Sequence, residues 1–144
     1  MSSPAEDLSA VLIAAGLGTF NATTGWSVAI GKEPTDPDTT ITLYDIGGLT
    51  PDPKWLLDYP SVQIRVRGEV SGYQAAWARM RQVRDELLGA DPFTQSGNSY
   101  RSLLLTGEAV HIGYDSHNRP MFTMTFSLIV EPAATAETNR EAIT

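Results

Sequence analysis

The stretch YPSVQIRVRG, residues 59–68, carries the clearest signal for the fold and raises the first functional question. Apolar and polar residues alternate along it, which is typical of a β-strand with one face in the core and one face outside. Arg65 and Arg67 share the polar face, in a chain with a formal net charge of −7. They could face water, nucleic acid or another protein. The residues expected to face the core are Val62, Ile64 and Val66.

A helix follows this strand and is the most regular element of the sequence. Ser71 begins a capping box and Gly89 provides a C-cap, so the helix is expected to run from residue 73 to about residue 88. Arg81 and Asp85 are four residues apart and can form an ion pair on its polar face. Its expected core-facing residues are Tyr73, Ala76, Trp77, Met80, Val83, Leu87 and Leu88.

A second helix is predicted at the start of the chain. Ser3 is placed as its N-cap, Pro4 as its first helical residue and Glu6 as the acidic residue of a capping box. Gly16 and Gly18 end it. The apolar stripe between these signals contains Leu8, Val11, Leu12 and Ala15.

Five further strands are predicted from β-branched and aromatic runs with partial alternation. The first two are expected to form a hairpin, and the turn DSHNRP joins the last two. Phe122, Met124, Phe126 and Leu128 share the apolar face of the final strand. The five runs cover residues 26–31, 39–46, 99–107, 109–116 and 120–132.

These elements predict an α+β fold, with a mostly antiparallel sheet of about six strands covered on one face by two amphipathic helices. Residues 1–132 form one domain, and the small, polar residues 133–144 are expected to be a flexible C-terminal tail. Residues 47–60 are expected to form a long loop, which is uncommon unless functional. Its apolar residues either fold back over the core or meet a partner; they include Trp55, Leu56 and Tyr59.

Composition excludes several classes of protein. The chain has no cysteine, which excludes disulfides, thiolate metal sites and a cysteine nucleophile. Its first residues lack the basic and apolar regions of a signal peptide, and its longest apolar run is too short to span a bilayer. We therefore expect a protein that is made and used without export and without a membrane.

Charge is unevenly distributed along the chain. Residues 1–60 contain eight acidic residues and two lysines, whereas residues 61–119 contain seven arginines and six acidic residues. The acidic balance argues against broad binding to nucleic-acid phosphates. Arginine is favoured where carboxylates are paired at protein interfaces.

No motif for catalysis, a metal or a cofactor is present in the sequence. His111 and His117 are expected to lie in a strand and a turn, without the spacing of a metal site. The nucleophile elbow G-x-S-x-G is absent, and the segment GLG at residues 16–18 lacks the third glycine of a dinucleotide site. We therefore expect no enzyme, no cofactor and no bound metal.

Three phrases together resemble a known family. They are YPSVQIRVRG, then GYQAAWARMRQVRDELLG, then YRSLLLTGEAVHIGYDSHNRPMFTMTFSLIVEP near the end. This order of strand, helix and closing strands is similar to that of the tail terminator and minor capsid proteins of long-tailed, siphovirus-type bacteriophages. The resemblance covers roughly residues 8–132; the proline-rich segment 47–60 and the acidic first half depart from some relatives.

The resemblance implies a structural protein of the virion, at the junction of tail and head, assembled in the host cytoplasm. Such proteins form a homo-oligomeric ring, commonly a hexamer, which caps the tail tube, stops its polymerisation and meets the head-completion or connector protein. DNA would pass through the ring without sequence-specific binding. The expected interface residues are Arg65, Arg67, Trp55, Leu56 and Tyr59.

Two alternatives remain open from the sequence. The chain could be a head-completion or stopper protein of the neck, which shares the small size and the ring. It could also be a small-molecule-binding α+β domain, although no set of converging polar residues indicates a pocket. Within the leading interpretation, the acidic first block and the arginines of the middle block are expected to supply complementary charged patches across the ring interface.

Overall fold

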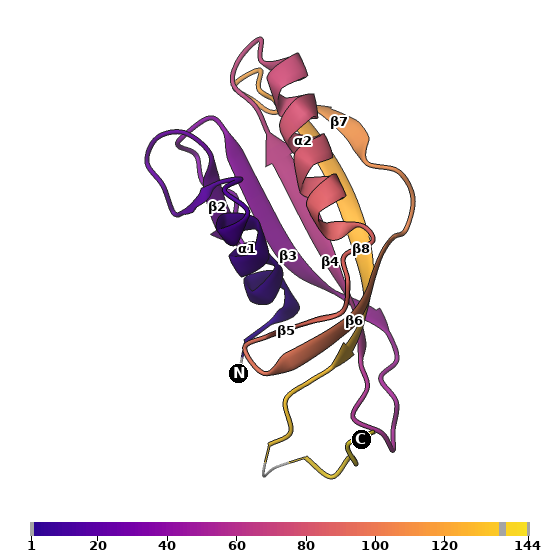
Figure 1. Ribbon diagram of the computed structural model, residues 1–144. Coiled ribbons are helices and arrows are strands. Elements are labelled where there is room, and N and C mark those ends of the chain that lie inside the picture. The colour runs from indigo at the N-terminus through magenta and orange to yellow at the C-terminus, as the bar shows by residue number, and fades with distance from the viewer. Residues whose placement is uncertain (1, 136–137, 144) are drawn as a thin grey trace.

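The computed structural model describes residues 2–135 and 138–143 and shows an α+β fold, as the sequence predicts. One curled, mostly antiparallel sheet carries both helices on the same face (Figure 1). The strand order is β1-β2-β3-β4-β8-β6-β5, and β7 also pairs with β8. The elements are α1 (Pro4–Ala14), β1 (Thr19–Phe20), β2 (Ser27–Ile30), β3 (Thr40–Leu49), β4 (Tyr59–Arg67), α2 (Tyr73–Leu87), β5 (Phe93–Gln95), β6 (Asn98–Leu105), β7 (Val110–Tyr114) and β8 (Pro120–Glu131).

Helix α1 has the predicted N-cap, first turn and end, but among the described residues no hydrogen bond of the Glu6 carboxylate completes the predicted capping box. The Ser3 hydroxyl accepts a hydrogen bond from the Glu6 backbone amide at 3.2 Å, and Pro4 occupies the first turn. Gly16 follows the helix in the left-handed region with φ +78°, which a glycine adopts without strain. The Asp45 carboxylate of β3 accepts a further hydrogen bond from the Ala5 amide at 2.9 Å, so the sheet itself caps the helix.

Helix α2 has the predicted extent but a different start. Ser71 has φ +61° and Gly72 is the N-cap, with no side-chain hydrogen bond, so the predicted capping box is wrong. A side chain at Gly72 would lie 2.9 Å from the Glu69 carbonyl oxygen, and this turn therefore requires glycine. The chain leaves the helix at Gly89, with φ +75°.

The buried face of α2 is narrower than predicted. Its buried residues are Ala76, Met80, Val83 and Leu87. Trp77 and Leu88 are exposed at its edge, where Trp77 stacks against the Arg81 guanidinium at 4.9 Å. The predicted pair of Arg81 with Asp85 is also wrong, because Asp85 binds Arg84 at 3.0 Å instead.

Strand β8 lies at the centre of the sheet, and its buried and half-buried residues alternate along its whole length. It pairs with β4 on one side. On the other side it pairs with β6 along its second half and with β7 along its first half. The predicted core residues of these strands are buried: Val62, Ile64, Val66, Phe122, Met124, Phe126 and Leu128.

The predicted hairpin of the first two strands is wrong, because β2 and β3 are parallel. After Gly31 (φ +79°) the chain returns without pairing and enters β3 in the same direction as β2. This return segment, residues 32–38, is called the strap below. It lies on the sheet face opposite the helices, where Arg67 binds it, since Arg67 alternates with the core residue Val66.

The predicted long loop at residues 47–60 is in part a hairpin. Strand β3 continues to Leu49 and β4 already begins at Tyr59, with an irregularity in register between Asp45 and Gly48. A side chain at Gly48 (φ +115°) would lie 2.2 Å from the Tyr59 carbonyl oxygen. The hairpin and its tip, residues 46–60, project from the body of the molecule as an arm (Figure 1).

Candidate functional site

The two arginines of the opening stretch lie in different environments. Arg67 is 2% exposed, and its guanidinium binds the strap. Its Nε donates to the Asp38 carbonyl at 2.9 Å, Nη2 donates to the Pro37 carbonyl at 2.7 Å, and Nη1 donates to the Glu33 carboxylate at 3.1 Å. Arg67 is therefore paired with the Glu33 carboxylate of the same chain, rather than with a carboxylate across an interface.

A second buried arginine supports the strap from the turn between β7 and β8. Arg119 donates through Nη1 to the Thr35 carbonyl at 2.7 Å and to the Asp38 carboxylate at 3.1 Å. Its Nε donates to the Asp115 carboxylate at 2.8 Å. Burial opposes ionisation of Asp115, but hydrogen bonds from Arg119 outweigh it and hold the pKa of this carboxyl below its usual value.

Arg65 lies on the same sheet face as Arg67, opposite the helices, and its guanidinium does not bind the strap; this face is called the open face below. It is half-buried between Thr42 on β3 and Thr123 on β8, and its guanidinium lies over the Tyr44 ring at 5.6 Å. Within the part of the chain that the structure describes, no carboxylate pairs with it. Its expected role at an interface stays a prediction.

The arm presents three exposed large apolar side chains, which are Ile46, Leu49 and Trp55. Leu49 is 77% exposed and Trp55 is 39% exposed, whereas Leu56 is buried and Tyr59 is half-buried. The two residues therefore differ, since Leu56 packs inward and Trp55 faces outward. The roles of Trp55, Leu56 and Tyr59 in binding a partner stay predictions.

The described part of the C-terminal segment lies along the arm. The Leu56 amide donates to the Glu141 carbonyl at 2.7 Å, and the Glu141 amide donates to the Lys54 carbonyl at 2.8 Å. The Arg140 guanidinium binds the Asp58 carboxylate at 2.7 Å. Residues 136, 137 and 144 of the predicted tail lie outside the described residues, and its flexibility and the domain boundary at residue 132 stay predictions.

The turn at the tip of the arm is held by a carboxylate. Asp52 accepts hydrogen bonds from the Lys54 and Trp55 backbone amides, both at 2.8 Å. The bonds from Trp55 and Lys54 hold the pKa of Asp52 below its usual value of 3.8. The arm tip is therefore ordered by the charged form of Asp52.

This turn is expected to loosen only in strong acid. Because the folded state lowers the pKa, the stabilisation is complete above pH 3.8 and is lost as the pH falls through the lower folded value. The backbone amide resonances of Lys54 and Trp55 should move with a midpoint below 3.8 in a pH titration followed by NMR. Asp52→Asn should abolish the movement, and a midpoint at or above 3.8 would contradict this account.

An open pocket of about 520 Å³ lies at the base of the arm. The start of α1, the arm, β6 and the C-terminal segment enclose it, and its polar side chains include the paired Asp58 and Arg140. Within residues 2–135 and 138–143, no cluster of His, Asp and Glu side chains could hold a metal ion. No helix in this part of the chain has the length and hydrophobicity needed to cross a bilayer.

A buried polar network, which no sequence motif predicts, connects α1 to β6. The Asp7 carboxylate accepts from the Tyr100 hydroxyl, from the Asn98 amide at 2.9 Å and from the Ser2 hydroxyl at 2.6 Å. Burial, and then the bond to Asp7, raise the pKa of Tyr100 far above its usual value, so its hydroxyl stays protonated. Asn98 also accepts from the Ala133 amide at 2.9 Å and so fixes the start of the C-terminal segment.

Comparison with known proteins gives one family and one informative fold. The family described as bacteriophage tail terminator protein matches residues 11–132. Among solved structures, a chain of the virion of a native gene transfer agent particle has a similar fold, with a TM-score of 0.60 and 20% sequence identity. The similarity covers 86% of this chain and 84% of that chain. No curated protein sequence matches.

Proposed function

The chain belongs to the bacteriophage tail terminator family, and we propose from this premise that it forms a ring that caps the tail tube and ends its polymerisation. It is a structural protein of a phage virion. The observation that carries the proposal is the extent of the family match, because residues 11–132 include the whole sheet and α2. The ring would stand at the junction of tail and head.

The proposed ring is homo-oligomeric, with six copies expected from the resemblance. One side would bind the tail tube protein and the other side a head-completion or connector protein, and DNA would pass through the lumen without sequence-specific contacts. The role is one of binding rather than catalysis. A chain of a gene transfer agent virion has the same fold, which supports assembly with other virion proteins.

We propose that the arm contacts another virion protein rather than a second copy of this chain. Exposed apolar side chains on a projecting element favour protein binding over solvent. Leu49 and Trp55 would make the contact, Tyr59 would border it, and buried Leu56 would support the tip. Arg65 would bind a carboxylate on the open face, whereas Arg67 is committed to the strap.

Electron microscopy of the purified protein mixed with tail tubes tests the proposal. We expect rings at one end of the tubes, and tubes that stop growing when the protein is added during polymerisation. Trp55→Asp should weaken tube binding, and Gln82→Asp, an exposed change on the outer face of α2, should not. Binding only to portal-bearing heads would indicate the head-completion role instead, and binding to neither would contradict both.

A further inference from the structure

The outer edge of β7 is an unprotected sheet edge. Strand β7 pairs with β8, and none of the described strands pairs with its other side. Val110, Ile112 and Tyr114 are exposed by 53%, 42% and 56%. Such edges are ordinarily blunted by charges, proline, bulges or short strand length. Strand β7 has five residues and a register irregularity between His111 and Gly113, but it contains no proline and no Asp, Glu, Lys or Arg.

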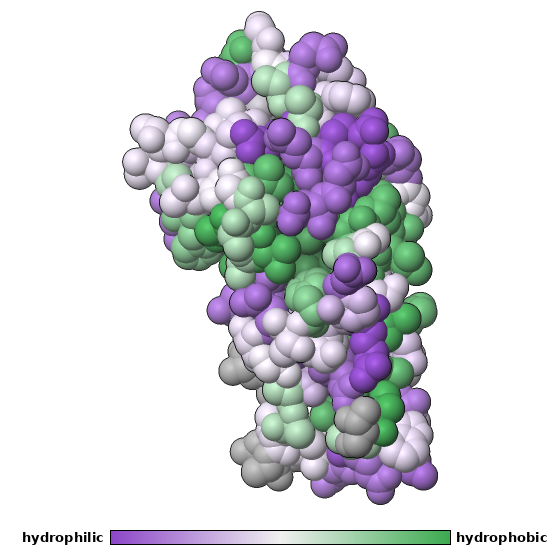
Figure 2. Space-filling view, viewed as in Figure 1, coloured by the Kyte–Doolittle hydropathy of each residue, from purple (hydrophilic) through white to green (hydrophobic). Residues whose placement is uncertain are grey.

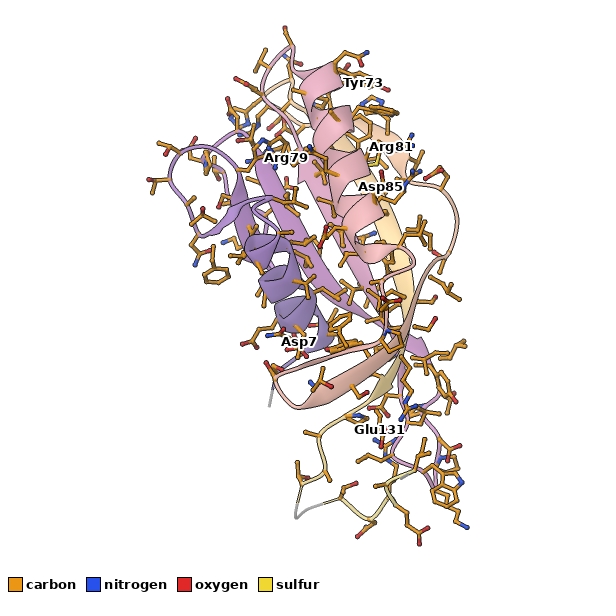
Figure 3. All side chains as sticks on the ribbon, in the orientation of Figure 1. Asp7, Tyr73, Arg79, Arg81, Asp85 and Glu131 are labelled. Carbon is orange, nitrogen blue, oxygen red and sulfur yellow. The ribbon has the colours of Figure 1, made fainter. Side chains whose placement is uncertain are left out.

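Helix α2 extends this surface. The Tyr73 ring contacts the His111 ring of β7 at 5.1 Å, and Arg84 binds Glu108 between β6 and β7 at 3.0 Å. Exposed Trp77 lies between Tyr73 and Arg84 on this side of the helix, and Figure 3 shows Arg79 on the other side, toward α1. We call the exposed apolar residues around this edge the β7 flank: Trp77 and Leu88 on the helix side, Leu104 on the opposite face of the sheet, and Val110, Ile112 and Tyr114 on β7 itself.

The β7 flank is nearly free of charge. Between residues 102 and 114, Glu108 is the single Asp, Glu, Lys or Arg, and Arg84 neutralises it. Hydrophobic side chains lie on the surface along the edge of the molecule where β6 continues toward β7 (Figure 2). A partner of this flank would therefore be apolar and uncharged.

The segment that forms the β1 edge of the sheet also contains few charged residues. Residues 8–31, which form most of α1 and all of β1 and β2, contain no Asp, Glu, Lys or Arg, in a chain with 19% charged residues. Strand β1 ends the sheet, its outer edge has no partner among the described strands, and Phe20 is 50% exposed. We call this surface, centred on Phe20, the β1 flank.

We infer that the β7 flank of one copy docks on the β1 flank of the next copy. Interface cores are depleted in charged residues and enriched in aromatic ones, and both flanks approach this composition. The cation beside the β1 flank is Arg79 of α2, whose guanidinium lies over the Trp26 ring at 4.9 Å. Each flank is also a free edge of the same sheet: β1 is the first strand of the strand order, and β7 pairs with β8 outside that order and leaves its other side open among the described strands. Two different surfaces on opposite sides make a head-to-tail contact that repeats, and closure of that repeat as a ring rests on the proposed function.

Disulfide cross-linking tests the contact directly, since the chain has no cysteine. A mixture of Phe20→Cys and Ile112→Cys proteins should give a linked dimer on a non-reducing gel, and the double variant should give a ladder. Gln82→Cys mixed with Ile112→Cys is the matched control and should give little product. The reaction is run with concentrated protein and again with protein on tail tubes; product no greater than the control in both settings would overturn the inference.

Charge substitutions give an independent test. Ile112→Asp and Phe20→Asp should each reduce assembly at least tenfold, measured by light scattering after gel filtration, with unchanged circular dichroism. Mixing the two variants should give dimers, because each protein retains one intact flank. Undiminished assembly of either variant would contradict the inference, as would a mixture that stays monomeric. Tubes capped by rings without the Phe20–Ile112 link would overturn this contact and leave the proposed function standing.

Discussion

Arg67→Ala is expected to lower the free energy of unfolding by about 3–5 kcal/mol, because it removes one partner of a buried ionic contact. The Arg67 side chain is 2% exposed and binds the strap through the Asp38 and Pro37 carbonyls and the Glu33 carboxylate. Without the guanidinium, these oxygen atoms of the strap lose their donor. The free energy of unfolding is measured by urea denaturation monitored by circular dichroism.

Arg65→Ala is the matched control, because Arg65 precedes Arg67 by two residues on the same strand and face. Its guanidinium stacks on Tyr44 without a carboxylate partner in the described part of the chain, so the expected loss is about 1 kcal/mol or less. Equal losses for the two variants would mean that the strap contributes little to stability.

The difference between these arginines shows where sequence reasoning reaches its limit. Alternation places both on the polar face of β4, which is correct. The two arginines differ because the strap binds Arg67 and does not bind Arg65. One strap residue that binds Arg67, Asp38, precedes it by 29 residues in the sequence. The path of the strap follows from the parallel pairing of β2 and β3. The sequence of residues 32–38 does not indicate whether the two strands are parallel or antiparallel.

Regular, amphipathic elements were predictable, and short or edge elements were not. Helix α2 and strand β8 have strong periodicity over many residues, so their extents and most buried residues follow from the sequence. Strands β1 and β5 have two and three residues, too few for any period, and were missed. The prediction that Trp77 lies in the core is wrong, because the spacing of apolar residues does not show how much of the helix surface the sheet covers.

The candidate contact surfaces were only partly predictable for an electrostatic reason. Charged patches were expected to join copies, yet most arginines already bind carboxylates within the chain; they are Arg67, Arg84, Arg101, Arg119 and Arg140. Such neutralised cations offer little to a partner. The run at residues 8–31, which contains no Asp, Glu, Lys or Arg, is visible in the sequence and supports the proposed β1 flank.

Asp7→Ala is the second substitution with a large expected effect, a loss of about 2–4 kcal/mol in the free energy of unfolding. Asp7 is buried in the first turn of α1 and accepts hydrogen bonds from Tyr100, Asn98 and Ser2. Its removal leaves the hydroxyl and amide donors buried without a partner. Glu6→Ala, one residue earlier and exposed, should change stability by no more than about 0.5 kcal/mol.

A double-mutant cycle separates the lost hydrogen bond from a general loss of packing. If the unpaired Tyr100 hydroxyl causes much of the penalty, Tyr100→Phe should cost less in the Asp7→Ala background than in the wild type. The expected coupling is about 1–2 kcal/mol, since the double variant no longer contains an unpaired hydroxyl at position 100. Additive losses would mean that Asp7 acts through α1 alone. Because Asn98 also holds the Ala133 amide, Asp7→Ala should further increase hydrogen exchange at the start of the C-terminal segment, whereas Glu6→Ala should not.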